Sequence, residues 1–131
     1  MGDYDDLPAD DTNLKNAYDI DDYDAVAEDD DNRVSQCATD EHTIHQFKNQ
    51  GSADDLVISA TCDLQSSVAP SQSTVYLQIY NRNSGEWETL DSNNATDADT
   101  DFVLSGSQVD NLSDYYDENF WVSCRVYQLA Q

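Results

Sequence analysis

The strongest constraint on the fold is an alternation of apolar and polar side chains with a period of two residues. Residues 73–81 alternate between the aliphatic Val75, Leu77 and Ile79 and the more polar Tyr76, Gln78 and Tyr80. Residues 120–129 alternate in the same way. Successive side chains of a strand point to opposite faces of a sheet, so both segments are expected to be strands with one face in a core.

Further segments have strand-like composition and are separated by turn signals. They are residues 23–27, 33–38, 43–49, 56–61, 86–91 and 100–105. The connection 81–85 ends in Gly85, which can take the positive φ that a tight hairpin needs. Strands at a spacing of about ten residues predict an all-β fold, an antiparallel β-sandwich or jelly roll of about eight strands. Residues 111–116 are expected to form one short helical turn.

The second constraint is charge. The chain has 28 acidic residues against five basic ones, a formal net charge of -23. Self-repulsion on this scale destabilises a compact protein at low ionic strength, and molar salt shortens the Debye length to about 3 Å. The surface is therefore interpreted as an adaptation to hypersaline conditions, with intrinsic disorder as the alternative, chiefly at the N-terminus. The same charge repels phosphate and argues against a nucleic-acid partner.

The N-terminal third is the most acidic part of the chain. Residues 1–32 hold 13 acidic residues and a single lysine, Lys15. We expect residues 1–21 to form an acidic extended arm, with one helical turn at 13–18, and residues 22–131 to form a single β-sandwich domain. Such an arm either stays solvated or orders against a neighbouring subunit. The sequence has neither a signal-peptide pattern nor an apolar run long enough for a membrane helix.

Five blocks in the second half of the chain carry a resemblance to a known class of module. They are Thr74-Val75-Tyr76-Leu77-Gln78-Ile79-Tyr80-Asn81, Glu86-Trp87-Glu88-Thr89-Leu90, Asp101-Phe102-Val103-Leu104-Ser105-Gly106, Leu112-Ser113-Asp114-Tyr115-Tyr116-Asp117 and Trp121-Val122-Ser123-Cys124-Arg125-Val126-Tyr127. Residues 40–128 resemble the galactose-binding-like β-sandwich modules of viral, surface and appendage proteins. The resemblance implies a fold, and roles such as sugar binding or a place in a larger assembly, but no ligand motif is matched.

The loop 91–101 is the best candidate for a metal site. Asp97, Asp99 and Asp101 alternate in it and Asp91 begins it, so short oxygen ligands could converge on Ca²⁺ or Mg²⁺. The alternative is an ordinary solvated acidic turn. No cofactor is expected to be required.

Other residues with chemical potential have structural interpretations. His42 and His45 are expected to face opposite sides of a strand, and the odd set Cys37, Cys62 and Cys124 to act as small buried apolar residues. The strand aromatics could form a sugar-stacking platform, but cross-strand pairing is the commoner role. No catalytic triad or carboxylate pair stands out, so the chain is not expected to be an enzyme.

Two classes of function follow. The first is a structural protein of a hypersaline particle, such as a capsid-decoration, turret, tail or fibre component of a haloarchaeal virus. Its partners would be other subunits of the same assembly, with homo-oligomers expected, and its location would be the virion or the outer cell surface. The second is a carbohydrate-binding or adhesin module of a halophile surface protein, with a glycan as partner.

Overall fold

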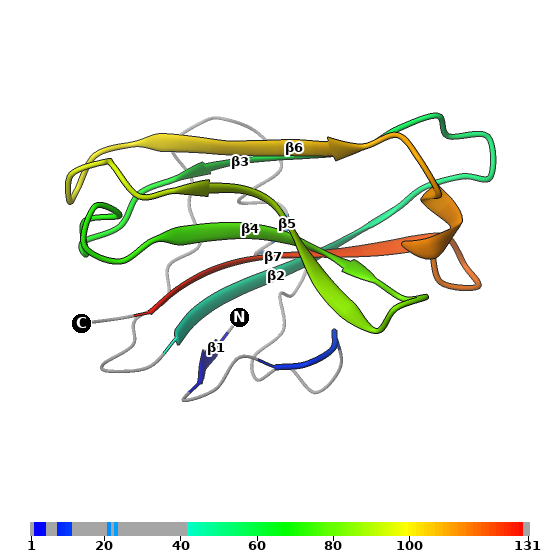
Figure 1. The fold of residues 1–131 in the computed structure, drawn as a ribbon, viewed down its shortest axis with the longest axis horizontal. Coiled ribbons are helices and arrows are strands. Elements are labelled where there is room, and N and C mark those ends of the chain that lie inside the picture. Colours follow the sequence, from blue (N-terminus) through cyan, green and yellow to red (C-terminus); the bar gives the residue numbers. More distant parts are fainter. Residues whose placement is uncertain (1, 5–7, 12–20, 22, 24–41, 130–131) are drawn as a thin grey trace.

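The computed structural model describes residues 2–4, 8–11, 21, 23 and 42–129, which form two antiparallel sheets (Figure 1). The larger sheet has the order β1 (Gly2–Tyr4), β2 (His42–Gln50), β7 (Trp121–Leu129), β4 (Val75–Asn81) and β5 (Glu86–Asn93). The smaller sheet pairs β3 (Ile58–Leu64) with β6 (Phe102–Gln108). The expected all-β class is confirmed for the described residues, and the arrangement is compatible with a β-sandwich.

The apolar core lies between the two sheets. In Figure 1 β3 and β6 run along one side of the larger sheet, over β4 and β7. The larger sheet contributes Leu77, Ile79, Val122, Cys124 and Val126 to the core, and the smaller sheet contributes Ala60, Phe102 and Leu104. These residues occupy alternate positions on their strands, so the predicted apolar faces are confirmed for β4 and β7. Phe120, which was expected on the same face, lies before β7 and is 37% exposed.

Four strands begin later than the sequence indicated: β4 begins at Val75 rather than residue 73, β7 at Trp121 rather than residue 120, and β3 and β6 two residues late, each after a turn. β3 begins at Ile58, not at residue 56, and Leu56 is 86% exposed. The Asp55 carboxylate accepts the backbone N–H of Ser52 (2.8 Å), which closes a turn just before it. β6 begins at Phe102, not at residue 100, after Asp99 takes a φ of 56°.

The turn elements match their predictions more closely. Gly85 has a φ of 73°, and its N–H donates to the Asn81 carbonyl (2.9 Å) between β4 and β5. The Asn81 side chain also accepts the N–H groups of Asn83 and Ser84, each at 3.0 Å. A 3₁₀ helix, η1 (Leu112–Asp114), forms within the short helical turn expected at 111–116.

The N-terminal arm is described only in part. β1 pairs with β2 through Gly2↔Ile44, Asp3↔Thr43 and Tyr4↔His42, and residues 8–11 are also described. Apart from Tyr23, the predicted strands 23–27 and 33–38 and the helical turn at 13–18 lie outside the described residues. The count of eight strands and the boundary between 1–21 and 22–131 therefore stay predictions. Within the described residues, no helix has the length and apolar character needed to cross a membrane.

Candidate functional site

The outer face of the larger sheet, turned away from β3 and β6, carries polar side chains that are mostly buried. Cross-strand register places Gln46 opposite Arg125, Lys48 opposite Ser123, and Gln78 opposite Arg125. Gln46, Gln78, Ser123 and Arg125 are each less than a tenth exposed. Buried polar groups require partners, so this face is organised around hydrogen bonds.

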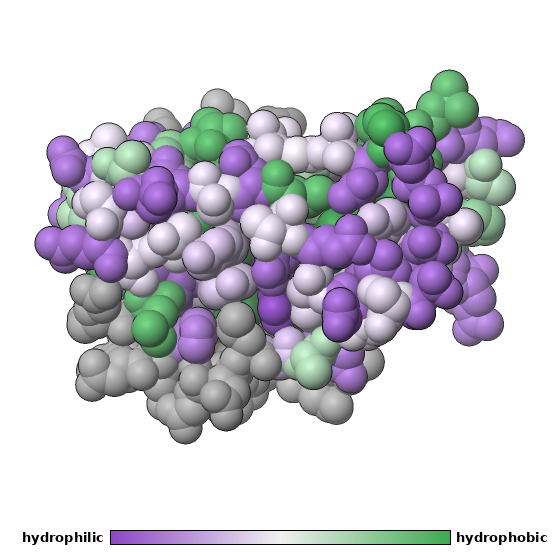
Figure 2. Space-filling model, viewed as in Figure 1, coloured by the Kyte–Doolittle hydropathy of each residue, from purple (hydrophilic) through white to green (hydrophobic). Residues whose placement is uncertain are grey.

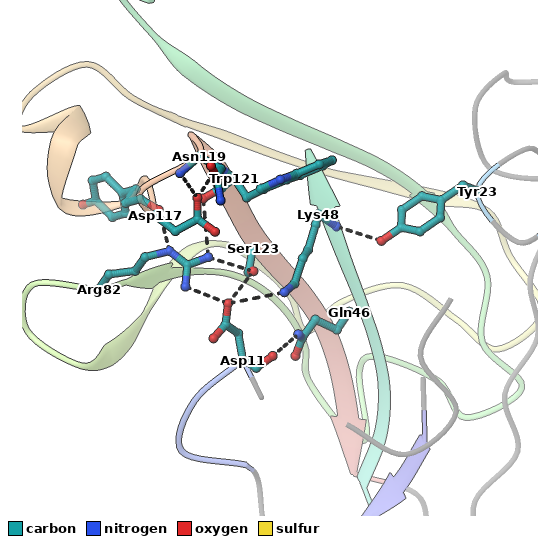
Figure 3. Close-up of polar contacts among 10 residues, drawn as sticks. Asp11, Tyr23, Gln46, Lys48, Arg82, Asp117, Asn119, Trp121 and Ser123 are labelled. Atoms are coloured by element: carbon teal, nitrogen blue, oxygen red, sulfur yellow. Dashed lines mark hydrogen bonds and ion pairs between the residues drawn. The ribbon is translucent and has the colours of Figure 1, made fainter. Parts of the chain in front are cut away.

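One cluster on this face holds a carboxylate from the N-terminal segment (Figure 3). The Asp11 carboxylate lies 2.9 Å from the Arg82 guanidinium and accepts the Ser123 hydroxyl at 2.7 Å. The Lys48 ammonium lies 4.0 Å away, and the Gln46 amide donates to the Asp11 carbonyl at 3.0 Å. We call these contacts of Asp11 with Gln46, Lys48, Arg82 and Ser123 the Asp11 clasp.

The sheet and the turn after β4 hold the clasp cations in place. The Arg82 guanidinium also donates to the Tyr115 carbonyl (3.2 Å) and to the Ser123 hydroxyl (3.2 Å). The Arg82 backbone N–H donates to the Asp114 carbonyl at 2.7 Å, which ties the turn to η1. The Asp11 side chain is 6% exposed, so the attraction between the charges is only weakly screened by solvent.

A second cation on the same face is stacked between aromatic rings. The Arg125 guanidinium lies 4.3 Å from the Trp87 ring centre and 5.3 Å from that of Tyr127. It donates to the Gln78 amide oxygen (2.9 Å) and to the Pro8 carbonyl (2.8 Å). Burial lowers the pKa of Arg125 to about 10, which still leaves it a cation at neutral pH. Arg125 thus joins the sheet to the N-terminal segment next to the Asp11 clasp.

The aromatic residues of the sheet form cross-strand pairs. Tyr76 and Tyr127 stack with ring centres 4.9 Å apart, and Tyr80 and Trp87 tilt together at 5.1 Å. Each pair is also a register pair of neighbouring strands. The cross-strand interpretation of these four aromatics is therefore confirmed.

An open hollow lies beside the clasp. Its volume is about 470 Å³, and Tyr23, Lys48, Asp117 and Trp121 line it. The Asp117 carboxylate accepts the N–H groups of Trp121 (2.9 Å) and Asn119 (2.8 Å), and the Trp121 bond contributes most to holding the pKa of Asp117 below its usual range. The hollow therefore presents an aromatic ring, an ammonium group and an ionised carboxylate (Figure 3).

The structure does not gather the four predicted metal ligands. The Asp91 carboxylate accepts the N–H of Ser105 on β6 (3.0 Å), while Asp97 and Asp99 are exposed. Asp101 is also exposed. In the described residues no three His, Cys, Asp or Glu side chains cluster in a way that could hold a metal ion. The Ca²⁺ or Mg²⁺ site at Asp91, Asp97, Asp99 and Asp101 stays a prediction.

The described histidines and cysteines that the sequence singled out lie on strands. His42 and His45 belong to β2 at positions of opposite facing, and the His42 ring packs edge-on against Tyr127. Cys62 and Cys124 are free thiols. Burial raises the pKa of Cys62 to about 11 and that of Cys124 to about 12, so both stay protonated at neutral pH. Cys37 lies outside the described residues.

Sequence reasoning missed the Asp11 clasp. The ion pair joins residues 71 positions apart, and nothing local distinguishes Asp11 from the other acidic residues of the arm. The useful signal was the scarcity of basic residues. In a chain with five of them, the positions of Lys48 and Arg125 on expected strands are the signal that could have located a surface able to hold an acidic segment.

No protein-family model, no curated protein and no solved structure matches this chain. The candidate site is therefore interpreted from its own geometry.

Proposed function

We propose that this chain is a non-enzymatic structural subunit of a particle that assembles in concentrated salt. Specifically, we propose that it is a capsid-decoration, turret, tail or fibre component of a haloarchaeal virus, located on the virion or an outer cell surface. The proposed fold is a galactose-binding-like sandwich of about eight strands with residues 1–21 as an acidic arm. The partners are further subunits of the same assembly.

The Asp11 clasp is the observation that carries the proposal. In this clasp the sheet binds an acidic segment of the chain: the buried Asp11 carboxylate lies 2.9 Å from the Arg82 guanidinium and accepts the Ser123 hydroxyl at 2.7 Å. The side chains of the clasp form hydrogen bonds and ion pairs with one another and with the segment, so their role is to hold the segment on the sheet. Surfaces that hold extended segments in this way are typical of proteins that assemble.

An exposed apolar patch gives independent support. Leu56, Val57 and Val109 are 86%, 47% and 64% exposed. They flank the last register pair of the smaller sheet, Ile58↔Gln108, so they lie at one end of that sheet. Figure 2 shows hydrophobic residues gathered beyond this end of β6 on an otherwise mostly hydrophilic face. Apolar side chains grouped on such a surface mark a contact with another molecule.

The test is the mass of the protein in molar NaCl, measured by gel filtration with light scattering. We expect a discrete oligomer whose mass is a multiple of the 14.7 kDa chain. The double substitution Leu56→Asp and Val109→Asp is expected to reduce association, because it places charge in the apolar patch. Ser107→Asp, at an exposed position on β6, is the matched control. A chain that stays monomeric at every protein and salt concentration would overturn the proposal.

The hollow beside the clasp favours a second candidate, a carbohydrate-binding or adhesin module. Trp121 is 37% exposed and could stack on a sugar ring, while Asp117 and Lys48 offer polar partners. A glycan array in molar NaCl tests this candidate. Binding that Trp121→Ala abolishes and Leu129→Ala preserves would favour it over the structural role. Leu129 suits the control because it is exposed at the opposite end of β7.

A further inference from the structure

Two described parts of the N-terminal segment, residues 2–4 and residues 8–11, are attached to the sheet at separate places. Its first described part, β1, adds as a strand to the edge of β2. Its second described part, residues 8–11, crosses the outer face, where Arg125 donates to the Pro8 carbonyl and Gln46 to the Asp11 carbonyl. The attachment therefore combines strand addition, backbone recognition and one buried ion pair (Figure 3).

Charge makes this face unusual in the molecule. All three basic residues that the structure describes, Lys48, Arg82 and Arg125, lie on it or at its margin, although the whole chain carries a net charge of -23. An acidic segment is repelled by most of this protein and attracted here. The face is thus complementary to the protein's own N-terminus.

The covalent connection does not dictate which copy supplies the segment. Residues 12–22 link Asp11 to Tyr23, whose hydroxyl accepts the Lys48 backbone N–H (3.2 Å), and residues 24–41 link Tyr23 to the start of β2 at His42. Fully extended, these two links reach at most about 40 Å and about 65 Å. The clasp contacts are identical whether the segment comes from the same chain or from a neighbour, so local concentration decides between the two.

We propose that in the assembled state residues 2–11 of one copy dock in the Asp11 clasp and on the β2 edge of a second copy. The inference rests on the structural role proposed above, because a particle holds neighbouring subunits at a concentration comparable to the roughly millimolar one that a linker provides. The exchange places β1 of one copy on the β2 edge that the neighbour's own β1 has left, and it buries the Asp11 carboxylate against the neighbour's Arg82 and Ser123. Exchange of an identical element is a low-cost route to oligomers.

Complementary charge reversal tests the exchange in the full-length chain. In the Asp11→Arg chain, the positive charge at position 11 is repelled by Arg82 of the same chain. In the Arg82→Asp chain, the Asp11 carboxylate is repelled by the negative charge at position 82 of the same chain. Mixing the two lets each arm find an oppositely charged receptor on the other chain. With two distinct affinity tags, we expect the mixture to give a co-purifying heterodimer in molar KCl and each variant alone to give little dimer through this contact.

Two controls make the result decisive. The pair Asp54→Arg and Arg82→Asp has the same charges, but Asp54 is exposed and lies outside the clasp, so no heterodimer is expected. The double variant Asp11→Arg with Arg82→Asp should recover the thermal midpoint lost by each single variant, and a cooperative melting transition of each single variant shows that it folds. A mixture that yields no heterodimer, although the double variant is rescued, would overturn the exchange. It would leave the structural role standing if the wild type still forms an oligomer.

Discussion

At the scale of single residues, a small group of carboxylates in this acidic chain stabilises turns and links strands through hydrogen bonds and one ion pair. Asp117 accepts two backbone N–H groups ahead of β7, and Asp55 accepts the Ser52 N–H and the Tyr116 hydroxyl, each at 2.8 Å. The Tyr116 bond is the main reason that the pKa of Asp55 lies below its usual range. Asp91 bonds to β6 and Asp11 to Arg82. Short side chains that accept backbone hydrogen bonds explain why aspartate suits the turns of this fold.

Arg125 gives the residue-scale prediction. Its planar guanidinium stacks on Trp87 while it donates to Gln78 and Pro8, a geometry that an ammonium group does not reproduce. We expect Arg125→Lys to lower the free energy of unfolding by about 1–3 kcal/mol, because a buried acceptor loses its donor. Urea unfolding in molar KCl, followed by tryptophan fluorescence, measures the change. Equal stability of the lysine variant and the wild type would show that charge alone is sufficient.

The sequence specified individual strand residues well and the candidate site poorly. The facing of Ser123, Arg125 and Tyr127 followed from alternation, because the period of a strand is local information. The partner of Arg82 did not, because an ion pair across 71 positions depends on how the sheet closes. The predicted ligand Asp91 shows the same limit, since its bond to Ser105 requires knowing that β5 and β6 are neighbours.

At the scale of elements, β5 connects the two sheets. Register along β4 and β5 shifts between Leu77 and Gln78, which pair with Asp91 and Thr89 and leave Leu90 as the extra residue of a bulge. Bulges increase strand twist, and β5 bends toward β6 in Figure 1. Beyond the bulge, Leu90 packs on the core and Asp91 bonds to β6. The sequence predicted both strands, but a bulge of one residue left no signal in its pattern.

Gly106 on β6 provides the element-scale prediction. A Cβ atom at this position would lie 2.7 Å from the Leu90 Cβ and 3.1 Å from the Leu90 carbonyl oxygen. Gly106→Ala would push β5 away from β6, and we expect a loss of about 1–3 kcal/mol in the free energy of unfolding, as for other overpacked sites. Ser107→Ala, at the exposed neighbouring position, is the control. Chemical denaturation of both variants decides, and an unchanged midpoint for Gly106→Ala would show that the two strands are not in close contact.

At the scale of the whole molecule, the apolar core and the described basic residues lie in different places. The core between the sheets is apolar, the described basic residues gather at the outer face of the larger sheet, and several carboxylates are exposed on loops, among them Asp54, Asp97 and Asp99. The net charge was evident from composition, whereas the concentration of cations on one face required the register of β2, β7 and β4. The molecule therefore attracts its own acidic segment at one face and repels acidic partners elsewhere.

Screening of this self-repulsion gives the last prediction. We expect the thermal midpoint to rise steadily from about 0.1 M to about 3 M NaCl or KCl, because the Debye length falls over that range to less than the spacing of surface charges. Salts can also stabilise through exclusion from the surface, so a variant with fewer charges separates the two effects. Replacing the exposed Asp54, Asp97 and Asp99 with asparagine removes three negative charges. This triple variant should have a higher midpoint at low salt and a shallower rise than the wild type. A midpoint that does not change with salt in the wild type, or a slope equal in both proteins, would show that self-repulsion does not limit the stability of this fold.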